Sequence, residues 1–270
     1  MKGQAFMFSF LTLTVIFFIL AIVRPVTAAE VIGHRGAAFY TPENTISSIK
    51  KALESGVDGV EIDVHLTKDG KIAVIHDKDT RRISGGAADL KVAETGWEEL
   101  KKIDAGSFKS AAFAGEKIPL LEEVLAIIPA DKKLFIEVKC GVEIFGVIGA
   151  VLEKSGRRGN TAIISFGLDV AAMAKIALPR CESYWIPGSK FFQGASVEDA
   201  IEIAARNNLD GLDLDYKQAS ASFVKKAKDA GLKFYVWTVD EPAAAAVLDS
   251  YGLNGITSNK PDVIIRKIKR

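Results

Sequence analysis

The feature that most constrains the fold is a regular alternation of short β-rich runs with longer segments of helical periodicity. This alternation is typical of βαβ units, in which helices join parallel strands. The strand candidates are 31–34, 57–63, 71–76, 133–139, 161–166, 182–186, 210–214 and 233–238. Eight such strands favour an α/β fold of the closed (β/α)8 type, a TIM barrel, over an open doubly wound sheet. No glycine-rich nucleotide-binding loop follows any of these runs.

The segments between the strands have the end signals of helices. In the first, Thr41 can cap the helix, Pro42 suits its first turn and Gly56 ends it. Apolar residues at helical spacing predict further helices over 121–128, 142–154, 197–207, 221–230 and 241–250.

Two places break the alternation. The turn Lys68-Asp69-Gly70 separates the second and third runs without a helix, so the third run forms either a hairpin or a further parallel strand. Residues 77–118 are too many for an ordinary connection of a few residues. We therefore expect an irregular barrel with a small inserted subdomain after strand three, over about 77–118.

The N-terminus has the layout of a secretory signal peptide. Lys2 precedes an apolar run over 5–23, and small residues at 26–29 offer a cleavage site after Ala28. The alternative is a retained membrane anchor, because about 20 apolar residues span a bilayer. We expect residues 1–28 to be removed and residues 29–270 to form one exported domain, periplasmic or secreted.

Charge and cysteine content narrow the possible partners. The formal net charge is +1, with 35 basic and 34 acidic residues and no basic block, which argues against nucleic-acid binding. Cys140 follows one strand and Cys181 precedes another, so in a parallel barrel the two thiols lie at opposite ends and are expected to be free. We infer no obligate protein partner, and the oligomeric state is left open.

Polar residues gather at the C-terminal ends of the predicted strands, where barrel enzymes place their reacting groups. These residues are His34, Arg35, Glu61, Asp63, His76, Glu137, Lys139 and Trp237. Charged groups in such positions need a partner or a metal to offset the loss of hydration.

The acidic residues of this set predict a cation site. Glu61 and Asp63 are two residues apart on one strand and face the same side. Glu137 can complete a set of three carboxylates, whose hard oxygen atoms suit one Ca²⁺ or Mg²⁺ ion. The alternative is ion pairing with Arg35 and Lys139, and the two arrangements can coexist.

The histidines of the set are candidates for proton transfer. His34 and His76 can each act as general acid or base near neutral pH. His65 lies beyond Asp63 and is expected at the surface or in a supporting position. A divalent metal with Arg35 and Lys139 at one mouth fits an anionic, phosphoryl-type substrate.

These residues fall within segments that resemble the glycerophosphodiester phosphodiesterase family. The segments come in the family's order and span nearly all of the chain after residue 28. They are His34-Arg35-Gly36, Pro42-Glu43-Asn44-Thr45, 59–77 (GVEIDVHLTKDGKIAVIHD), Glu137-Val138-Lys139, Ser165-Phe166 and Val236-Trp237-Thr238-Val239.

The resemblance implies an irregular barrel with an insertion after strand three, and release of glycerol 3-phosphate and an alcohol from a small glycerophosphodiester. It implies that Glu61, Asp63 and Glu137 hold the cation and that His34 and His76 are the acid and base. Arg35 and Lys139 are expected near the phosphate, and Trp237 is expected to contact the substrate.

Some positions depart from the family's pattern and leave the head-group preference open. The segment 257–261 lacks the acidic residue that often precedes its proline, and Gly167 stands where aspartate is frequent. Asp213 and Asp215 look individual to this chain.

Two other functions remain as alternatives. A phospholipase D-type enzyme acting on lysolipids or sphingolipids would have an apolar groove in the insertion, for which Trp97, Phe108 and Phe113 are candidates. A catalytically silent phosphodiester-binding protein would lack a catalytic histidine or a metal carboxylate, and here all of them are present.

Overall fold

The strands close into a single parallel barrel. In a computed structural model, which describes residues 28–269, the ring of eight strands closes through pairing of the first with the second along the chain. The ring consists of β1 (Glu30–Gly33), β2 (Gly59–Leu66), β4 (Lys133–Val138), β5 (Thr161–Ser165), β6 (Glu182–Trp185), β7 (Gly211–Asp215), β8 (Lys233–Trp237) and β9 (Gly255–Ser258). The predicted fold class is confirmed.

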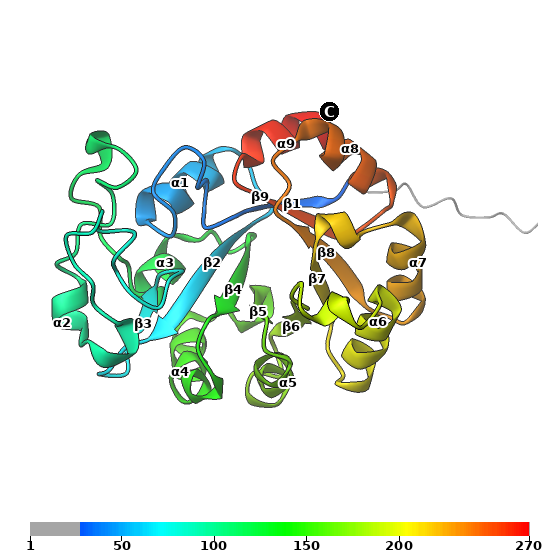
Figure 1. Ribbon diagram of the computed structural model, residues 1–270, viewed down its shortest axis with the longest axis horizontal. Coiled ribbons are helices and arrows are strands. Elements are labelled where there is room, and N and C mark those ends of the chain that lie inside the picture. Colours follow the sequence, from blue (N-terminus) through cyan, green and yellow to red (C-terminus); the bar gives the residue numbers. More distant parts are fainter. Residues whose placement is uncertain (1–27, 270) are drawn as a thin grey trace, which may run out of the picture.

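Helices surround the barrel (Figure 1). They are α1 (Ile46–Glu54), α3 (Leu121–Ile127), α4 (Phe145–Ser155), α5 (Leu168–Ala177), α6 (Val197–Arg206), α7 (Ala221–Asp229), α8 (Pro242–Ser250) and α9 (Pro261–Ile268). Because side chains alternate along a strand, residues such as Ile62 and Ile136 pack outward against helices. Phe135, Tyr184 and Tyr235 point the other way and fill the barrel interior.

One barrel strand differs from the sequence prediction. The run 71–76 forms β3 (Ile72–Val74), which pairs antiparallel with β2 and lies outside the ring. The hairpin alternative is therefore the observed one. A hairpin could have placed Asp63 directly across from His76, but the observed register pairs Val64 with Val74 and puts Ile75 across from Asp63. The eighth ring strand is β9, whose four residues include a glycine and two polar residues and give little strand signal.

The helices also differ in places. Thr45, and not Thr41, caps α1, because residues before it form turns in which Asn44 has a φ of +60°. The helices α5 and α9 were not predicted, nor was the short α2 (Trp97–Leu100). The other predicted helices are present within one to three residues of their expected ends.

The segment between β3 and α3 has a small core of its own. It contains α2 (Trp97–Leu100) and short 3₁₀ turns at Val92–Glu94 and Ala111–Phe113. Leu100 and other buried apolar residues form a cluster on which Trp97 and Phe108 pack. This part of the chain lies beside β3 at one side of the barrel (Figure 1).

Cys140 and Cys181 are free, as predicted. Within residues 28–269, every helix is too short or too polar to cross a bilayer. The leader expected over residues 1–28 lies, apart from Ala28, outside the described residues and stays a prediction.

We predict that Gly211→Ala destabilises the barrel by about 1–3 kcal/mol, because overpacking forces backbone shifts. Gly211 begins β7, and a Cβ atom there would lie 2.2 Å from the carbonyl oxygen of Lys233 in β8. Gly194→Ala is the matched control, since its Cβ would meet open space at a negative φ of −139°. Urea unfolding measures both, and equal free energies of unfolding for the two variants would contradict the prediction.

Candidate active site

A cavity of about 320 Å³ opens at the C-terminal ends of the strands. Seven of the eight residues predicted at this mouth line it, and Asp63 lies fully buried behind them. The lining residues are His34, Arg35, Glu61, His76, Glu137, Lys139, Ile164, Phe166, Ile186, Asp213, Trp237, Thr238 and Thr257. The barrel topology thus brings together groups that are far apart in the sequence.

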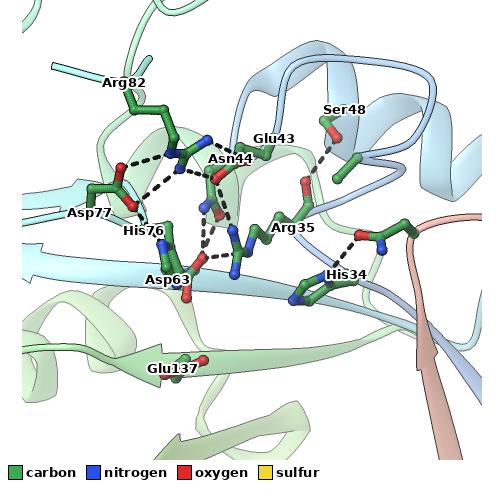
Figure 2. A network of polar contacts seen from close by, with 12 residues as sticks. His34, Arg35, Glu43, Asn44, Ser48, Asp63, His76, Asp77, Arg82 and Glu137 are labelled. Carbon is green, nitrogen blue, oxygen red and sulfur yellow. Dashed lines mark hydrogen bonds and ion pairs between the residues drawn. The ribbon is translucent and has the colours of Figure 1, made fainter. Parts of the chain in front are cut away.

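Three of these groups form a compact carboxylate cluster. Glu61 and Asp63 come from β2 and Glu137 from the adjacent β4, where it is the register partner of Asp63. All three are buried, and each offers an oxygen atom such that these atoms lie within 4.8 Å of one another. Figure 2 shows Asp63 and Glu137 on neighbouring strands of this wall.

The protein holds one oxygen of each β2 carboxylate by a hydrogen bond, and among the described residues the other oxygen accepts none. Glu61 Oε2 accepts a hydrogen bond from the backbone amide of Arg35 at 2.8 Å, and Asp63 Oδ2 accepts one from Asn44 Nδ2 at 2.8 Å. Among the described residues, Glu61 Oε1 and Asp63 Oδ1 are buried without a hydrogen-bond partner. These hydrogen bonds fix the orientation of both carboxylates, whose cluster could hold a metal ion.

The pKa values reflect a shortage of positive charge. Burial and the nearby carboxylates of Asp63 and Glu137 raise the pKa of Glu61 well above its usual range. Burial and Asp63 raise the pKa of Glu137 to about 7. Burial acts the same way on Asp63, but the charges of Arg35 and Lys139 outweigh it and lower its pKa. The site accommodates one carboxylate charge well and disfavours the other two.

Arg35 and Lys139 supply the two cations of the cluster. Arg35 Nε lies 3.1 Å from Asp63 Oδ2, and Lys139 Nζ lies 2.7 Å from Glu137 Oε1 and 3.5 Å from Asp63 Oδ1. The predicted ion pairs are therefore present. Arg35 is held in a left-handed conformation with a φ of +50°, and Gly36 follows with +86°. A Cβ atom at Gly36 would lie 2.4 Å from Ser48 on α1, so that this close approach requires glycine.

His34 is held by an amide. Its Nδ1 lies 2.7 Å from Asn259 Oδ1 (Figure 2). Asn259 donates both its Nδ2 and its backbone amide to the carboxylate of Asp240, each at 2.8 Å. The amide oxygen must then face His34 and can only accept, so Nδ1 carries the proton and Nε2 has a free lone pair. Burial and the charge of Arg35 lower the pKa of His34 to about 4, which keeps the ring neutral.

His76 has a carboxylate partner instead. Its Nδ1 lies 2.7 Å from Asp77 Oδ1, and Asp77 in turn binds Arg82 Nε at 2.7 Å (Figure 2). Burial opposes ionisation of Asp77, but the hydrogen bonds from Arg82 and His76 lower its pKa to about 2. Arg82 also pairs with Glu43, which contacts Arg35. A continuous series of polar contacts therefore connects His76 with Arg35.

The remaining histidine supports this arrangement from behind. His65 is only 8% exposed, and its Nε2 lies 3.1 Å from the carbonyl oxygen of His76. Of its two expected positions, the surface one is wrong and the supporting one is observed. His65 is buried because β2 continues past Asp63 to Leu66. His65 is therefore still within the strand, where it pairs with Ala73 of β3.

Two aromatic residues form part of the cavity wall. The rings of Phe166 and Trp237 meet edge to face with centroids 5.7 Å apart, and Lys139 Nζ lies 5.4 Å from the Phe166 centroid. Trp237 Nε1 donates to the backbone carbonyl of Asp213 at 3.2 Å. The predicted substrate-contacting Trp237 is therefore fixed in place at the cavity.

Sequence reasoning did not assign roles to several residues that shape the site. Glu43 and Asn44 were noticed as part of a motif, and Asn259 only as part of a segment that departs from the family. Asp77 followed His76 directly, which was an available signal for its pairing. Asp240 carries no local signal, because its partners Ser258 and Asn259 lie 18 and 19 residues further along the chain. Arg82 is only five residues after Asp77, but its other partner, Glu43, is 39 residues away.

Comparison with known proteins agrees with this geometry. The model of the glycerophosphoryl diester phosphodiesterase family matches residues 34–263. A glycerophosphodiester phosphodiesterase of Caldanaerobacter subterraneus subsp. tengcongensis is 35% identical over 253 residues, which cover 89% of this chain and 98% of the relative. A glycerophosphodiester phosphodiesterase of Bacillus subtilis is 30% identical over 256 residues, covering 88% and 86%.

A solved structure adds the fold. An Oleispira antarctica phosphodiesterase in complex with the product sn-glycerol-3-phosphate superposes with a TM-score of 0.81 at 27% identity, covering 90% of this chain and 98% of that chain. The family match spans most of the chain, and the similarity to the Caldanaerobacter relative extends over nearly the whole of both proteins. The chain belongs to the glycerophosphoryl diester phosphodiesterase family.

Proposed function

We propose that this enzyme hydrolyses glycerophosphodiesters to glycerol 3-phosphate and an alcohol, with a divalent cation at Glu61, Asp63 and Glu137 and with His34 and His76 as base and acid. One observation carries the proposal: a buried carboxylate cluster lies in the same cavity as two histidines that have contrasting partners. The names of the relatives and the product bound to the Oleispira structure support the choice of substrate.

The carboxylate cluster fits a hard divalent cation. Its donors are all oxygen atoms, two of them buried without a hydrogen-bond partner within residues 28–269. Three carboxylates face only two cationic side chains there, Arg35 and Lys139. Ca²⁺ and Mg²⁺ prefer such ligands. When bound, the ion would supply Lewis-acid polarisation of phosphate and hydroxyl oxygens.

Arg35 and Lys139 would position the phosphodiester. Both side chains line the cavity beside the carboxylates. A guanidinium and an ammonium group together can bind two phosphate oxygens and stabilise the charge that develops during phosphoryl transfer. Their ion pairs keep both groups in place before the substrate arrives.

The histidine partners suggest which group is the base. His34 presents the free lone pair of Nε2, so it can take a proton from the nucleophile, which is a water or the substrate's 2-hydroxyl. The carboxylate of Asp77 can stabilise a His76 imidazolium, which can then protonate the leaving alcohol. Figure 2 shows the two rings on either side of Arg35.

The contacts in the insertion do not favour a phospholipase D-type enzyme acting on lysolipids or sphingolipids. Two of the three aromatic candidates, Trp97 and Phe108, pack on the insertion's own core, whereas Phe113 does not belong to that cluster. The depression beside Trp97 is also lined by Lys101, Lys102 and Lys117, and these ammonium groups would be poor neighbours for an acyl chain.

The first prediction concerns the cation. A chelator should abolish release of glycerol 3-phosphate from glycerophosphocholine, and Ca²⁺ or Mg²⁺ should restore it. Calorimetric titration of the chelated protein should show one site that Glu61→Gln weakens at least tenfold, because a charged ligand is lost. Glu122→Gln, on the exposed face of α3, is the matched control. Full turnover by protein shown to be metal-free would refute the cation's role.

The second prediction concerns pH. The folded-state pKa of Glu137 is raised from 4.5 to about 7. Its contribution to stability is therefore complete below about pH 4.5 and is lost as pH rises through about 7. In chelator, Glu137→Gln should match the wild type in Tm near pH 4.5 and exceed it at pH 7.5. Calcium should raise the wild-type Tm most at pH 7.5, where protons compete least. A constant Tm difference between the two proteins across this range would contradict the prediction.

The third prediction separates the histidines from the cation. His34→Ala and His76→Ala should each lower kcat by about 10²-fold or more, since general acid or base catalysis contributes about 10²–10⁴. Asn259→Leu leaves both rings in place but removes the partner of His34, and a loss of about tenfold is expected. Calorimetric cation affinity should survive in all three variants. Loss of the cation in both histidine variants would make the histidines ligands instead.

A further inference from the structure

Asp213 is a buried carboxyl group to which no role has been assigned so far. It lies on β7 with 2% of its surface exposed, and it lines the cavity. Its Oδ1 is buried without a hydrogen-bond partner among the described residues. A carboxyl group that is buried unpaired destabilises a fold, so its presence in the cavity wall calls for a functional explanation.

This carboxyl group stands apart from the carboxylate cluster. The oxygens that lie within 4.8 Å of one another belong to Glu61, Asp63 and Glu137 and do not include Asp213. Burial, together with the like charge of Glu137, raises the pKa of Asp213 well above its usual range. A neutral carboxyl group can both donate and accept a hydrogen bond, which makes it a suitable partner for an alcohol hydroxyl.

We take the deep end of the cavity, its floor, to lie at Asp213, because this lining residue is only 2% exposed. Ile164 and Ile186 are each 2% exposed, whereas Phe166 is 43% exposed. In the ring of strands, β7 is separated from β2 by three strands in either direction, so Asp213 faces the cluster from the far wall. A substrate whose phosphate lies between Arg35 and Lys139 would therefore extend one end to the floor and the other end to the rim.

The exposure of the two histidines indicates which end of the substrate, the head group or the glycerol moiety, lies at the rim of the cavity. The His76 side chain is 30% exposed and that of His34 is 16% exposed. The proposed acid, His76, is thus nearer to solvent, where head groups of varied size can leave. If the head group lies at the rim, the small glycerol moiety lies at the floor of the cavity, beside Asp213.

We propose that Asp213 hydrogen-bonds the terminal hydroxyl of the glycerol moiety, and so selects phosphodiesters that carry no acyl chain. This inference rests on the proposed function and adds a specificity-determining residue to it. In a lysolipid that hydroxyl is esterified, so it offers no proton, and its chain would meet a floor closed by Ile164 and Ile186.

The test compares three phosphocholine substrates by choline release: glycerophosphocholine, its analogue built on propane-1,2-diol without the terminal hydroxyl, and lysophosphatidylcholine. For the wild type, kcat/KM should fall about 10- to 100-fold on the analogue, the range for one lost hydrogen bond to a buried polar group. The value for lysophosphatidylcholine should be lower still. Asp213→Leu should act on glycerophosphocholine and the analogue equally, while Asp213→Asn should keep most of the discrimination.

Two further measurements test whether Asp213 has only a structural role. Asp213→Leu removes an unpartnered buried carboxyl group, so its Tm should be equal to or above that of the wild type. The control Asp215→Asn changes a residue of the same strand that accepts from the Lys217 amide and lies outside the cavity lining. It should leave the substrate discrimination unchanged.

The outcomes distinguish this inference from the proposed function. If the wild type releases no glycerol 3-phosphate from glycerophosphocholine, the proposed function falls and the inference falls with it. Suppose that the wild type releases glycerol 3-phosphate. The role of Asp213 alone is then overturned by any of three results: equal kcat/KM of the wild type on glycerophosphocholine and the analogue, discrimination retained by Asp213→Leu, or discrimination lost by Asp215→Asn. If Asp213→Leu does not fold, a structural role is indicated, and the wild-type and Asp213→Asn ratios then decide the hydroxyl contact.

Discussion

The site depends on burying more negative than positive charge at one end of the barrel. Glu61, Asp63 and Glu137 share a wall that also holds Arg35 and Lys139. Ion pairing satisfies Asp63, while the pKa values of Glu61 and Glu137 remain raised. A buried pair of ions gains stability only when its geometry is good and its other polar atoms are satisfied. Glu61 Oε1 and Asp63 Oδ1 have no hydrogen-bond partner among the described residues, so this cluster could hold a metal ion.

This requirement explains the irregular parts of the fold. The left-handed turn at Arg35-Gly36 points the Arg35 amide at Glu61 while its guanidinium reaches Asp63. Because β3 pairs with β2 in a hairpin outside the ring, His76 lines the cavity although it does not follow a strand of the barrel. Arg82, from the segment between β3 and α3, binds both Asp77 and Glu43. The insertion is thus tied to the catalytic wall by charge.

The sequence reveals the parts of this arrangement that have local signals. Glu61 and Asp63 are recognisable because charged residues interrupt an otherwise apolar strand, and His34 and His76 because each ends a β-rich run. The parallel barrel then places these ends at one mouth. Strand β9 was not predicted because four residues with a glycine barely differ from a loop. Without β9, the contact of Asn259 with His34 could not be foreseen, since 225 residues separate them and only ring closure joins them.

The contrast between the two histidines follows from what each strand end provides. His34 directly follows β1, which pairs with β9, and it contacts the amide of Asn259, whose orientation is fixed by Asp240. His76 follows the hairpin at the edge of the insertion and receives a carboxylate held by Arg82. These different partners support the proposed assignment of His34 as the base and His76 as the acid. Two chemically identical side chains therefore have different surroundings because the fold brings a different side chain to each, and His34 is also less exposed than His76.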